Sequence, residues 1–371
     1  MDKKPIFIER KIDTKIQAYL DLPEILAIVG PRQSGKTTYL QNLLQAKDGF
    51  YLSFEDRDAL NLFNTDIKQF VEKYIKKMDL ICIDEFQYAK EGGKNLKYIY
   101  DTFQGKKIII SGSSAIDITV HTIKYLVGRV VVVNFWPFDK AELKTVFPHF
   151  SDRELYEYYA KFGGYPRVAI ASDDEERKLV LKNIYNTYFL REVKDILGLV
   201  DEYKIQKLLI YLAQSVGGTV NYSKVSSLCD IPERDVRKYL EFMNKTFVAY
   251  LALPFYTNKL REIIKQPKIY FLDSGFLNHI LSYEVESGKK LEQVILMESL
   301  KKGFECRYWR TKLGQEMDFV MYKDNKILAA LEAKVGGQYT KSFGAFKNTY
   351  KEISAHLVTP ENVFQTMDVL R

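Results

Sequence analysis

Short apolar runs alternate with helical patterns over the first part of the chain. Five of them, EILAIVG, FYLSFE, DLICIDE, KIIISGS and RVVVVNF, are almost unbroken by polar residues between about residues 22 and 135. Runs of this kind are typical of strands covered on both faces, as in a parallel sheet with helices on either side. The pattern therefore predicts an α/β fold built on a parallel sheet.

A different pattern follows this region. From about residue 139 to 195 it is helical, broken at FGGYP, where two glycines and a proline force a turn. Between residues 202 and 255, three helical segments, YKIQKLLIYLAQSVG, SKVSSLCD and PERDVRKYLEFMNKTF, precede the strand-like VAYLALPF. Three small helices and a β-ribbon describe a winged helix, a form of helix-turn-helix. Residues 288–371 then offer one helix, several strands and further helices, enough for a small domain.

Length and composition indicate a chain with several cores. At 371 residues it exceeds what one hydrophobic core organises. No stretch approaches the roughly 18 uncharged apolar residues that would span a bilayer. Cys82, Cys229 and Cys306 are scattered and odd in number, and MDKKPIFIERK lacks the apolar core of a secretory signal. We therefore expect a cytoplasmic protein with no membrane partner.

Charge and metal-binding residues narrow the chemistry only slightly. Lys and Arg exceed Asp and Glu by 55 to 48, and the resulting net charge of +7 permits a polyanionic partner without establishing one. Four histidines and no paired cysteines argue against a structural zinc site, so that a metal would need oxygen ligands. Magnesium is the natural candidate.

A phosphate-binding motif follows the first predicted strand. GPRQSGKTT matches G-x-x-x-x-G-K-[ST] and lies between the apolar EILAIV and the helical TTYLQNLLQ, which is the context that the motif requires. The glycines let backbone N–H groups wrap the β-phosphate, Lys36 would reach the β- and γ-phosphates, and the Thr37 hydroxyl would bind Mg²⁺. The expected ATP site consists of Gly30, Pro31, Arg32, Gln33, Ser34, Gly35, Lys36, Thr37 and Thr38.

LICIDEF supplies the second half of an ATPase site. Its strand ends in Asp84, which would hold Mg²⁺ through water, and Glu85, placed to orient or deprotonate the attacking water. KIIISGSS ends another strand in hydroxyls, and Ser111 or Ser113 would sense the γ-phosphate. LVGRV offers Arg129 as a catalytic cation, in cis or from a neighbouring subunit. The alternatives are a serine that only forms a turn and an arginine that only lies on the surface.

These motifs, together with WPFDKAEL, FGGYPRV, YFLREVKDI and IYFLDSGFLN in this order, resemble the AAA-type ATPases of the STAND and Orc-like clade. The resemblance is to a widespread archaeal and bacterial family whose phosphate loop reads GPRQxGKTT, and it covers nearly the full chain. It implies that GGYP approaches the adenine or ribose, which would make Gly164 and Pro166 nucleotide neighbours.

The third helical segment of the predicted winged helix has a basic face. Val236, Leu240 and Met243 recur at helical spacing and would point into the core. The remaining face would suit a DNA major groove, where its cations meet phosphates first. The alternative is a solvated face in a domain that only packs on the ATPase. The predicted DNA-binding residues are Arg234, Arg237, Lys238 and Lys245, and the basic character continues in Lys259, Arg261, Lys265 and Lys268.

A hairpin near the C-terminus gathers three ionisable residues. MDFVMYKDNKILAALEAK, residues 317–334, is two apolar runs joined by KDN. Glu332 and Lys334 point the same way because strand side chains alternate, and Asp318 lies on the partner strand. Magnesium-dependent phosphodiester cleavage needs two carboxylates on a metal and a lysine. The spacing resembles that of the PD-(D/E)xK nuclease superfamily, in which an acid on the preceding helix often completes the set.

Two glutamates of the preceding helix are candidates for this fourth group. Periodicity slightly favours Glu298, whereas the family pattern LEQVI points to Glu292, which we adopt. Domains of this kind also occur as DNA-binding folds that do not cut.

The sequence as a whole predicts a Mg²⁺-dependent ATPase that binds and remodels DNA, with branched junctions and ends as candidate substrates and a homo-oligomer as a candidate assembly. Two alternatives remain: a STAND-like nucleotide switch for protein partners, and an ATP-gated, metal-dependent nuclease. The predicted domains are a P-loop AAA-type ATPase core at 1–138, a helical lid at 139–198, a winged helix at 199–285 and a small α/β restriction-endonuclease-like domain at 286–371.

Overall fold

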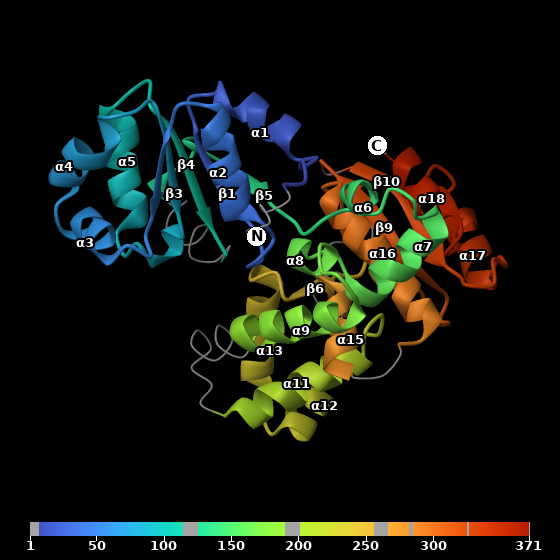
Figure 1. Ribbon diagram of the computed structural model, residues 1–371. Helices are drawn as coiled ribbons and strands as arrows, with labels where there is room; N and C mark the ends of the chain where they lie inside the picture. Colours follow the sequence, from blue (N-terminus) through green and yellow to red (C-terminus); the bar gives the residue numbers. More distant parts are fainter. Residues whose placement is uncertain are drawn as a thin grey trace. The chain divides into compact units, whose positions relative to one another are not determined.

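Five short apolar strands form one parallel sheet with the order β2-β3-β4-β1-β5 (Figure 1). Every residue of β1 is buried, which explains why its sequence lacks a polar alternation. The predicted α/β fold with a parallel sheet is therefore confirmed. The strands are β1 Ile25–Val29, β2 Phe50–Ser53, β3 Leu80–Asp84, β4 Lys107–Gly112 and β5 Val130–Asn134.

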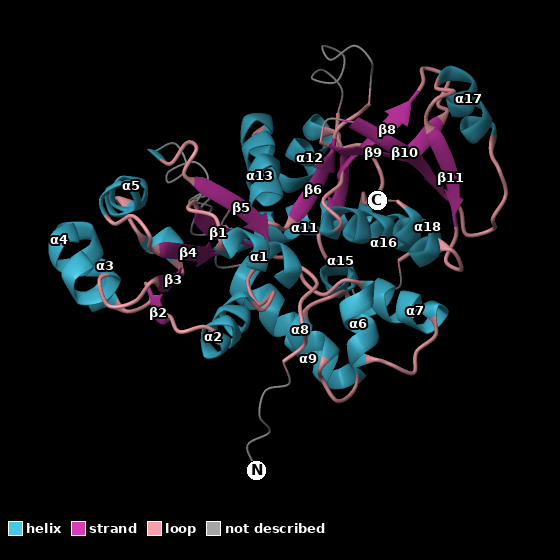
Figure 2. Ribbon diagram, turned by 90° about the horizontal axis from the view of Figure 1, so that it is seen from above, coloured by secondary structure: helices cyan, strands magenta, loops and turns pink. Residues whose placement is uncertain are grey.

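Helices cover both faces of this sheet. On one face, α1 and α2 bury Ile16 and Leu40 against Leu26 and Ile28, and α5 lies on the other face (Figures 1 and 2). Because the strands are parallel, the loops that follow β1, β3 and β4 meet at one edge of the sheet. The helices are α1 Asp13–Leu20, α2 Lys36–Ala46, α3 Arg57–Thr65, α4 Ile67–Phe70 and α5 Gly92–Thr102.

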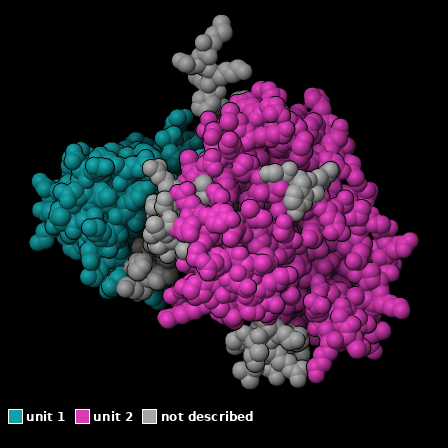
Figure 3. Space-filling view, turned by 90° about the horizontal axis from the view of Figure 1, so that it is seen from below, with its two compact units in different colours: residues 1–138, 245–247 teal, residues 139–244, 248–371 magenta. Residues whose placement is uncertain are grey.

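The chain divides into two compact units, which Figure 3 colours separately: residues 1–138 with 245–247, and residues 139–244 with 248–371. The computed structural model describes residues 7–113, 125–189, 201–255, 266–281, 285–324 and 326–370. Within these ranges, no helix is long and apolar enough to cross a membrane. The three domains predicted after residue 138 fall in the second unit, except for residues 245–247 of the predicted winged helix, and the boundaries between them stay predictions.

The second unit begins with helices. The three segments predicted within residues 202–247 are the helices α11, α12 and α13, and an antiparallel ribbon of β6 and β7 follows them. The assignment of this arrangement as a winged helix stays a prediction. The elements are α6 Lys140–Val146, α7 Asp152–Phe162, α8 Pro166–Ala169, α9 Asp174–Ile184, α11 Glu202–Gln214, α12 Tyr222–Cys229, α13 Glu233–Lys245, β6 Ala249–Ala252 and β7 Lys268–Phe271.

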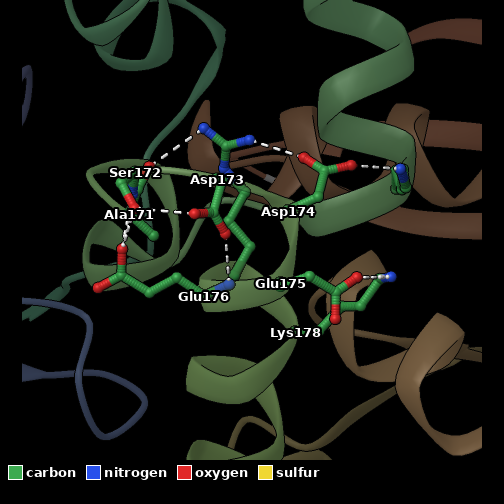
Figure 4. Close-up of polar contacts among 9 residues, drawn as sticks. Ala171, Ser172, Asp173, Asp174, Glu175, Glu176 and Lys178 are labelled. Carbon is green, nitrogen blue, oxygen red and sulfur yellow. Dashed lines mark hydrogen bonds and ion pairs between the residues drawn. The ribbon is translucent and has the colours of Figure 1, made fainter.

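The start of α9 shows how local polar residues set a helix boundary (Figure 4). The Asp173 carboxylate accepts the Glu176 backbone N–H at 2.9 Å. In return, the backbone N–H and hydroxyl of Ser172 each donate to the Glu176 carboxylate at 2.7 Å. These bonds satisfy N–H groups that the first helical turn leaves without an intrahelical partner. The sequence SDDEE therefore begins this helix by its own chemistry.

A second sheet, with the order β11-β10-β9-β8, occupies the C-terminal part. The predicted hairpin is the antiparallel pair β9 and β10, and β11 lies parallel to β10. Helix α17 packs Phe343 and Phe346 against Val320 and Ala330, while α16 lies on the other face (Figure 2). The elements are α15 Ser274–Leu281, α16 Ser287–Lys301, β8 Glu305–Arg310, β9 Glu316–Lys323, β10 Lys326–Ala333, α17 Lys341–Thr349, β11 Ser354–Val358 and α18 Val363–Val369.

The FGGYP turn is held inside the second unit by a buried carboxylate. Asp273 accepts the backbone N–H of Gly164 and that of Gly275, both at 2.8 Å. Burial raises the pKa of Asp273 to about 6, and these hydrogen bonds oppose the shift. Gly163 has φ +74°, and a Cβ atom there would lie 1.9 Å from Asp273 Oδ1. The motifs FGGYP and LDSG are therefore held together as one tightly packed, hydrogen-bonded joint.

This joint predicts a specific cost for Gly163→Ala. The left-handed backbone costs alanine about 1 kcal/mol, and displacement of Asp273 from its donors adds roughly 1–3 kcal/mol. Gly303→Ala is the matched control, because Gly303 has φ +80° and nothing within 4 Å of a Cβ atom. Urea unfolding of the full chain, followed by circular dichroism, should show the larger loss for Gly163→Ala. Equal losses in the two variants would contradict the role given to Asp273.

Candidate functional site

The phosphate loop connects β1 to α2 by a path that only glycine allows at two points. A Cβ atom on Gly30 would lie 2.1 Å from the carbonyl oxygen of Phe135, the residue that follows β5. The loop therefore packs directly against the backbone at the end of this strand. Gly35 has φ +96° and caps α2. The first turn of α2 then directs its N–H groups and its positive dipole at the loop. This is the geometry expected of a phosphate cradle.

The Lys36 ammonium lies within this loop. The side chain is buried, and its Nζ donates to the carbonyl oxygens of Gly30 at 2.8 Å and Pro31 at 2.9 Å. These contacts hold the cation across the loop, where a phosphate group would meet it. Ser34 is fully buried, and its hydroxyl oxygen has no hydrogen-bond partner among the described residues. The loop thus offers both a charge and an unused polar group to a ligand.

Asp84, at the end of β3, receives hydrogen bonds from three other elements. Thr37 of α2 and Tyr51 of β2 donate to Oδ2 at 2.6 Å and 2.8 Å. Ser111 of β4 donates to Oδ1, as does the Glu85 backbone N–H at 3.0 Å. Charge-assisted hydrogen bonds of this kind offset the cost of burying a carboxylate, and Asp84 is 1 % exposed. Burial and then the Asp84 charge raise the pKa of Tyr51, which keeps its donor proton.

Glu85 follows in a strained position. Its φ is +54°, in the left-handed region that non-glycine residues seldom adopt. Burial, and then the charge of Asp84, raise its pKa above the ordinary glutamate value. The Gln87 side-chain amide donates to the Glu85 carboxylate and lies 3.4 Å from the Ser113 hydroxyl. Glu85 is thus oriented by a neighbour two residues away.

These residues fit a magnesium ion. Mg²⁺ prefers oxygen ligands and is usually held by one or two carboxylate or hydroxyl groups together with phosphate oxygens and water. The Thr37 hydroxyl and the Asp84 carboxylate, 2.6 Å apart, provide such oxygens beside the phosphate loop. The Ser111 hydroxyl donates to Asp84 and so helps to position this carboxylate. The expectation that Ser111 or Ser113 senses the γ-phosphate stays a prediction.

Three residues at this site were not found by sequence reasoning: Arg10, Tyr51 and Gln87. Arg10 donates from Nη1 to the Ser34 carbonyl oxygen at 2.9 Å, and its guanidinium lies 4.2 Å from the centroid of the Phe135 ring. These partners are 24 and 125 residues away in the chain, so no local pattern indicates them. Of the three, only Gln87 could have been suspected from the sequence, because in DEFQ it lies two residues after Glu85.

Arg129 lies at the opposite edge of the sheet from the phosphate loop of its own chain. It precedes Val130, which pairs with Ile25 at the start of β1, whereas the loop follows the end of β1. Five residues at about 3.3 Å each separate the two edges by roughly 16 Å. Its guanidinium forms an ion pair with Asp101 at 2.8 Å. A contact with nucleotide would have to come from a second copy of the chain, and this role stays a prediction.

Gly164 and Pro166 lie in the second unit, where Gly164 binds Asp273 and Pro166 begins α8. Their expected contact with adenine or ribose stays a prediction.

Helix α13 buries Val236, Leu240 and Met243. The four basic side chains proposed for DNA are exposed: Arg234, Arg237, Lys238 and Lys245. Two of them form ion pairs with acidic residues of the same helix. Arg237 pairs with Glu233 at 2.6 Å, and Lys238 pairs with Asp235 at 3.3 Å. Their part in DNA binding stays a prediction.

One residue of the predicted basic surface is placed differently. Lys268 was expected to continue that surface, and this is wrong, because its side chain is 2 % exposed and forms ion pairs with Glu316 and Asp318. The carboxylates had no visible connection to Lys268 in the sequence, since they lie about 50 residues further along. Lys259, Arg261 and Lys265 lie outside the described residues.

The predicted nuclease residues lie around the β9–β10 hairpin. Asp318 Oδ2 accepts the backbone N–H of Ala333, next to Glu332, at 2.9 Å. Glu332 is buried and accepts the Thr340 hydroxyl at 2.6 Å, while Lys334 lies 3.9 Å from it and is 44 % exposed.

The two helix acids occupy different surroundings. Glu292 accepts the Tyr270 hydroxyl at 2.8 Å, and the nearby Asp318 charge helps to raise its pKa. Glu298 instead accepts the Lys140 backbone N–H at 3.1 Å, and burial together with the Asp139 charge raises its pKa to about 7. Of the two, Glu292 is the one beside Asp318.

Comparisons with known families match three segments of the chain. Residues 22–144 match the AAA domain, residues 153–287 match a domain of unknown function (DUF8612), and residues 287–368 match another (DUF4143). The first unit is thus an ATPase-like, AAA-type phosphate-loop domain.

Similar proteins span most of the chain. An uncharacterized protein of Haemophilus influenzae is 26% identical over 99% of this chain and 96% of its own length. One of Methanocaldococcus jannaschii is 26% identical over 88% of this chain and 77% of its own length. Among solved structures, a Walker-type ATPase of Pyrococcus abyssi (16% identity, 74% of this chain, 96% of that chain, TM-score 0.44) is similar, as is the ORC2 protein of Aeropyrum pernix (11%, 72%, 89%, 0.40).

The contacts of Arg10 predict that it positions the phosphate loop. Arg10→Ala should weaken ATP binding about tenfold, because loss of the charge-assisted bond to the Ser34 carbonyl is worth roughly 1.5 kcal/mol. Lys11→Ala is the matched control, since it removes the same charge from an exposed neighbour. Titration calorimetry with a non-hydrolysable ATP analogue measures both. Equal affinities of Arg10→Ala and the unaltered chain would refute the positioning role.

Proposed function

We propose that this chain is a Mg²⁺-dependent ATPase that binds and remodels DNA, with branched junctions or ends as candidate substrates. The observation that carries the ATPase part is the hydrogen-bonded Asp84, which brings together Thr37 of the phosphate-loop helix and Ser111 of β4. Because Glu85 follows on the same strand end, a base lies next to the position of a bound triphosphate.

Binding of ATP would use the loop between β1 and α2. The N–H groups at the start of α2 would donate to the phosphate oxygens, and the dipole of this helix favours their negative charge. Lys36 would exchange its contacts with the Gly30 and Pro31 carbonyls for contacts with the β- and γ-phosphates. Arg10 keeps the loop in place through the Ser34 carbonyl.

Hydrolysis would use the oxygens at the end of β3. When bound, Mg²⁺ neutralises charge on the phosphates, and Thr37 and Asp84 would hold it. Tyr51 and Ser111 fix the Asp84 carboxylate through its two oxygens, so that it does not rotate away. Lys36 would stabilise the charge that develops on the transferred phosphoryl group.

Glu85 would accept the proton of the attacking water. Its raised pKa makes it a better base than an exposed glutamate, as long as the pH keeps it ionised. Since the folded pKa is raised, activity should fall as the pH decreases through a range above that of an ordinary glutamate. Gln87 holds the carboxylate by a hydrogen bond and would release or reorient it when water binds.

DNA binding is supported by the exposed cations on α13. Arg234, Arg237, Lys238 and Lys245 lie on the face of this helix opposite to its buried residues. The Arg237 guanidinium also lies 3.9 Å from the centroid of the Tyr222 ring, which holds it in place. Cations arranged in this way would contact phosphates, which gives affinity rather than sequence preference.

DNA should stimulate ATP hydrolysis if the two units are coupled. We expect the full chain to hydrolyse ATP faster with duplex, single-stranded or four-way-junction DNA, and Glu85→Gln to bind ATP while its turnover falls by a factor of about 100 or more. A phosphate-release assay with and without each DNA, beside Lys36→Ala, measures this. Slow turnover unaffected by every DNA, with no DNA binding at moderate salt, would favour the nucleotide switch instead.

The α13 face predicts a change in salt dependence. Arg234→Ala with Lys245→Ala should weaken binding of all DNA sequences about equally and reduce the slope of log K against log salt by about 2, because two phosphate contacts are lost. Lys341→Ala with Lys351→Ala removes the same charge from exposed positions elsewhere in the second unit. Fluorescence anisotropy at several salt concentrations compares the pairs. A slope that changes equally in both would exclude a specific role for α13.

A further inference from the structure

A buried lysine lies among the carboxylates that the nuclease hypothesis assigns to a metal. Lys268, on β7, is 2 % exposed; its Nζ forms ion pairs with Glu316 and, at 3.4 Å, with Asp318 Oδ1. Tyr270, two residues further on the same strand, donates its hydroxyl to Glu292 at 2.8 Å. Since residues two apart on a strand share a face, both side chains are directed to one group of acids. We call Lys268, Glu292, Glu316 and Asp318 the carboxylate centre.

The charges of this centre keep Lys268 protonated. Burial lowers the pKa of Lys268, but the negative charges of Asp318, Glu292 and Glu316 together raise it above the ordinary lysine value. A buried ammonium without such partners would lose its proton or destabilise the fold. At Glu292, burial and the Asp318 charge raise the pKa to about 7, and the charge of Lys268 opposes this. Because the Lys268 ammonium forms ion pairs with Glu316 and Asp318, the centre contains its own cation.

Both carboxylate oxygens of Asp318 are already used by protein donors, and Glu332 has one oxygen so used. Asp318 Oδ1 faces Lys268, and its Oδ2 accepts the Ala333 backbone N–H at 2.9 Å. Glu332 Oε1 accepts the Thr340 hydroxyl at 2.6 Å, and its Oε2 is buried without a hydrogen-bond partner among the described residues. Mg²⁺ would need several free oxygens at about 2.1 Å.

The residues present therefore do not fit a divalent metal. Across the described ranges, no group of three His, Cys, Asp or Glu residues is arranged to hold one. A metal at Asp318 Oδ1 would have to displace the Lys268 ammonium, which lies 3.4 Å from this oxygen, because two like charges that close repel strongly away from bulk water. Lys334, the lysine of the nuclease-like spacing, is 44 % exposed and lies 3.9 Å from Glu332.

We propose that Lys268 is the resident cation of the carboxylate centre, that it excludes divalent metal from Asp318, and that it fixes the ribbon after α13 to strand β9. Because β7 carries both Lys268 and Tyr270, the ribbon is attached to β9 and α16 by charge and hydrogen bonds. The centre is thus a structural clamp in which an ammonium takes the place of a metal. On this proposal the hairpin that carries Asp318 has a structural role and not a nucleolytic one.

Metal binding in the absence of ATP and DNA tests this proposal. The protein is the full chain with Lys36→Ala, which weakens the phosphate-loop site, titrated with Mn²⁺ and followed by electron paramagnetic resonance. In the chain with Lys268 intact, we expect Asp318→Asn to leave Mn²⁺ binding unchanged, because no Mn²⁺ site includes Asp318. Lys268→Met should create a site that binds Mn²⁺ at least about tenfold more tightly than any residual binding by the chain with Lys268 intact, because removal of the like charge favours the metal. Lys268→Met with Asp318→Asn should abolish this site, and Lys326→Met, an exposed lysine on β10, should create none.

Two results would overturn the proposal. One is a Mn²⁺ site in the chain with Lys268 intact that Asp318→Asn removes; the other is a folded Lys268→Met variant that gains no site. Thermal unfolding shows whether Lys268→Met folds, and Lys268→Gln, which keeps a hydrogen-bond donor, is the second variant. If neither variant folds, Mn²⁺ binding by the chain with Lys268 intact, measured with and without Asp318→Asn, still tests the proposal. Since neither ATP nor DNA is present, the outcome is independent of the ATPase and DNA-binding proposals.

Discussion

A buried carboxylate must receive hydrogen bonds or an opposite charge, and this constraint organises both units of the protein. Asp84 collects donors from α2, β2 and β4 and so fixes the edge of the sheet where the phosphate loop lies. Asp273 holds the Gly164 turn against the start of α15. Asp318 joins β7, β9 and β10. In each case one acid connects segments that are distant in the sequence, so its removal would release several elements at once.

Local chemistry explains why much of the fold could be predicted. Apolar runs such as EILAIV specify buried parallel strands without knowledge of their partners, and GPRQSGKTT specifies a loop because its glycines and Lys36 act over nine residues. The position of Asp84 and Glu85 could likewise be predicted, since Asp84 ends an apolar strand and Glu85 follows it. The same reasoning located the β9–β10 hairpin, whose two strands are joined by a short turn.

Long-range partners explain what could not be predicted. Lys268 has the sequence context of a surface lysine, and only Glu316 and Asp318, about 50 residues later, make it a buried ion. Arg10 contacts the phosphate loop 24 residues away. The glycines of FGGYP indicated a turn, but the sequence gives no sign that Asp273 occupies the space a Cβ atom would need. Where a charged residue points depends on a partner that local periodicity does not reveal.

The two acidic centres differ in the kind of donor that surrounds the carboxylate. Hydroxyl donors such as Thr37 and Ser111 carry lone pairs, so they can turn from donating to Asp84 to sharing a cation with it. An ammonium has three donors and no acceptor, so Lys268 can only occupy the place of a cation. The hydroxyl donors of Asp84 would therefore let it share a bound cation, whereas the ammonium beside Asp318 would not. The chemistry of the donors, and not the number of acids, is thus what distinguishes the proposed ligand site from the proposed structural clamp.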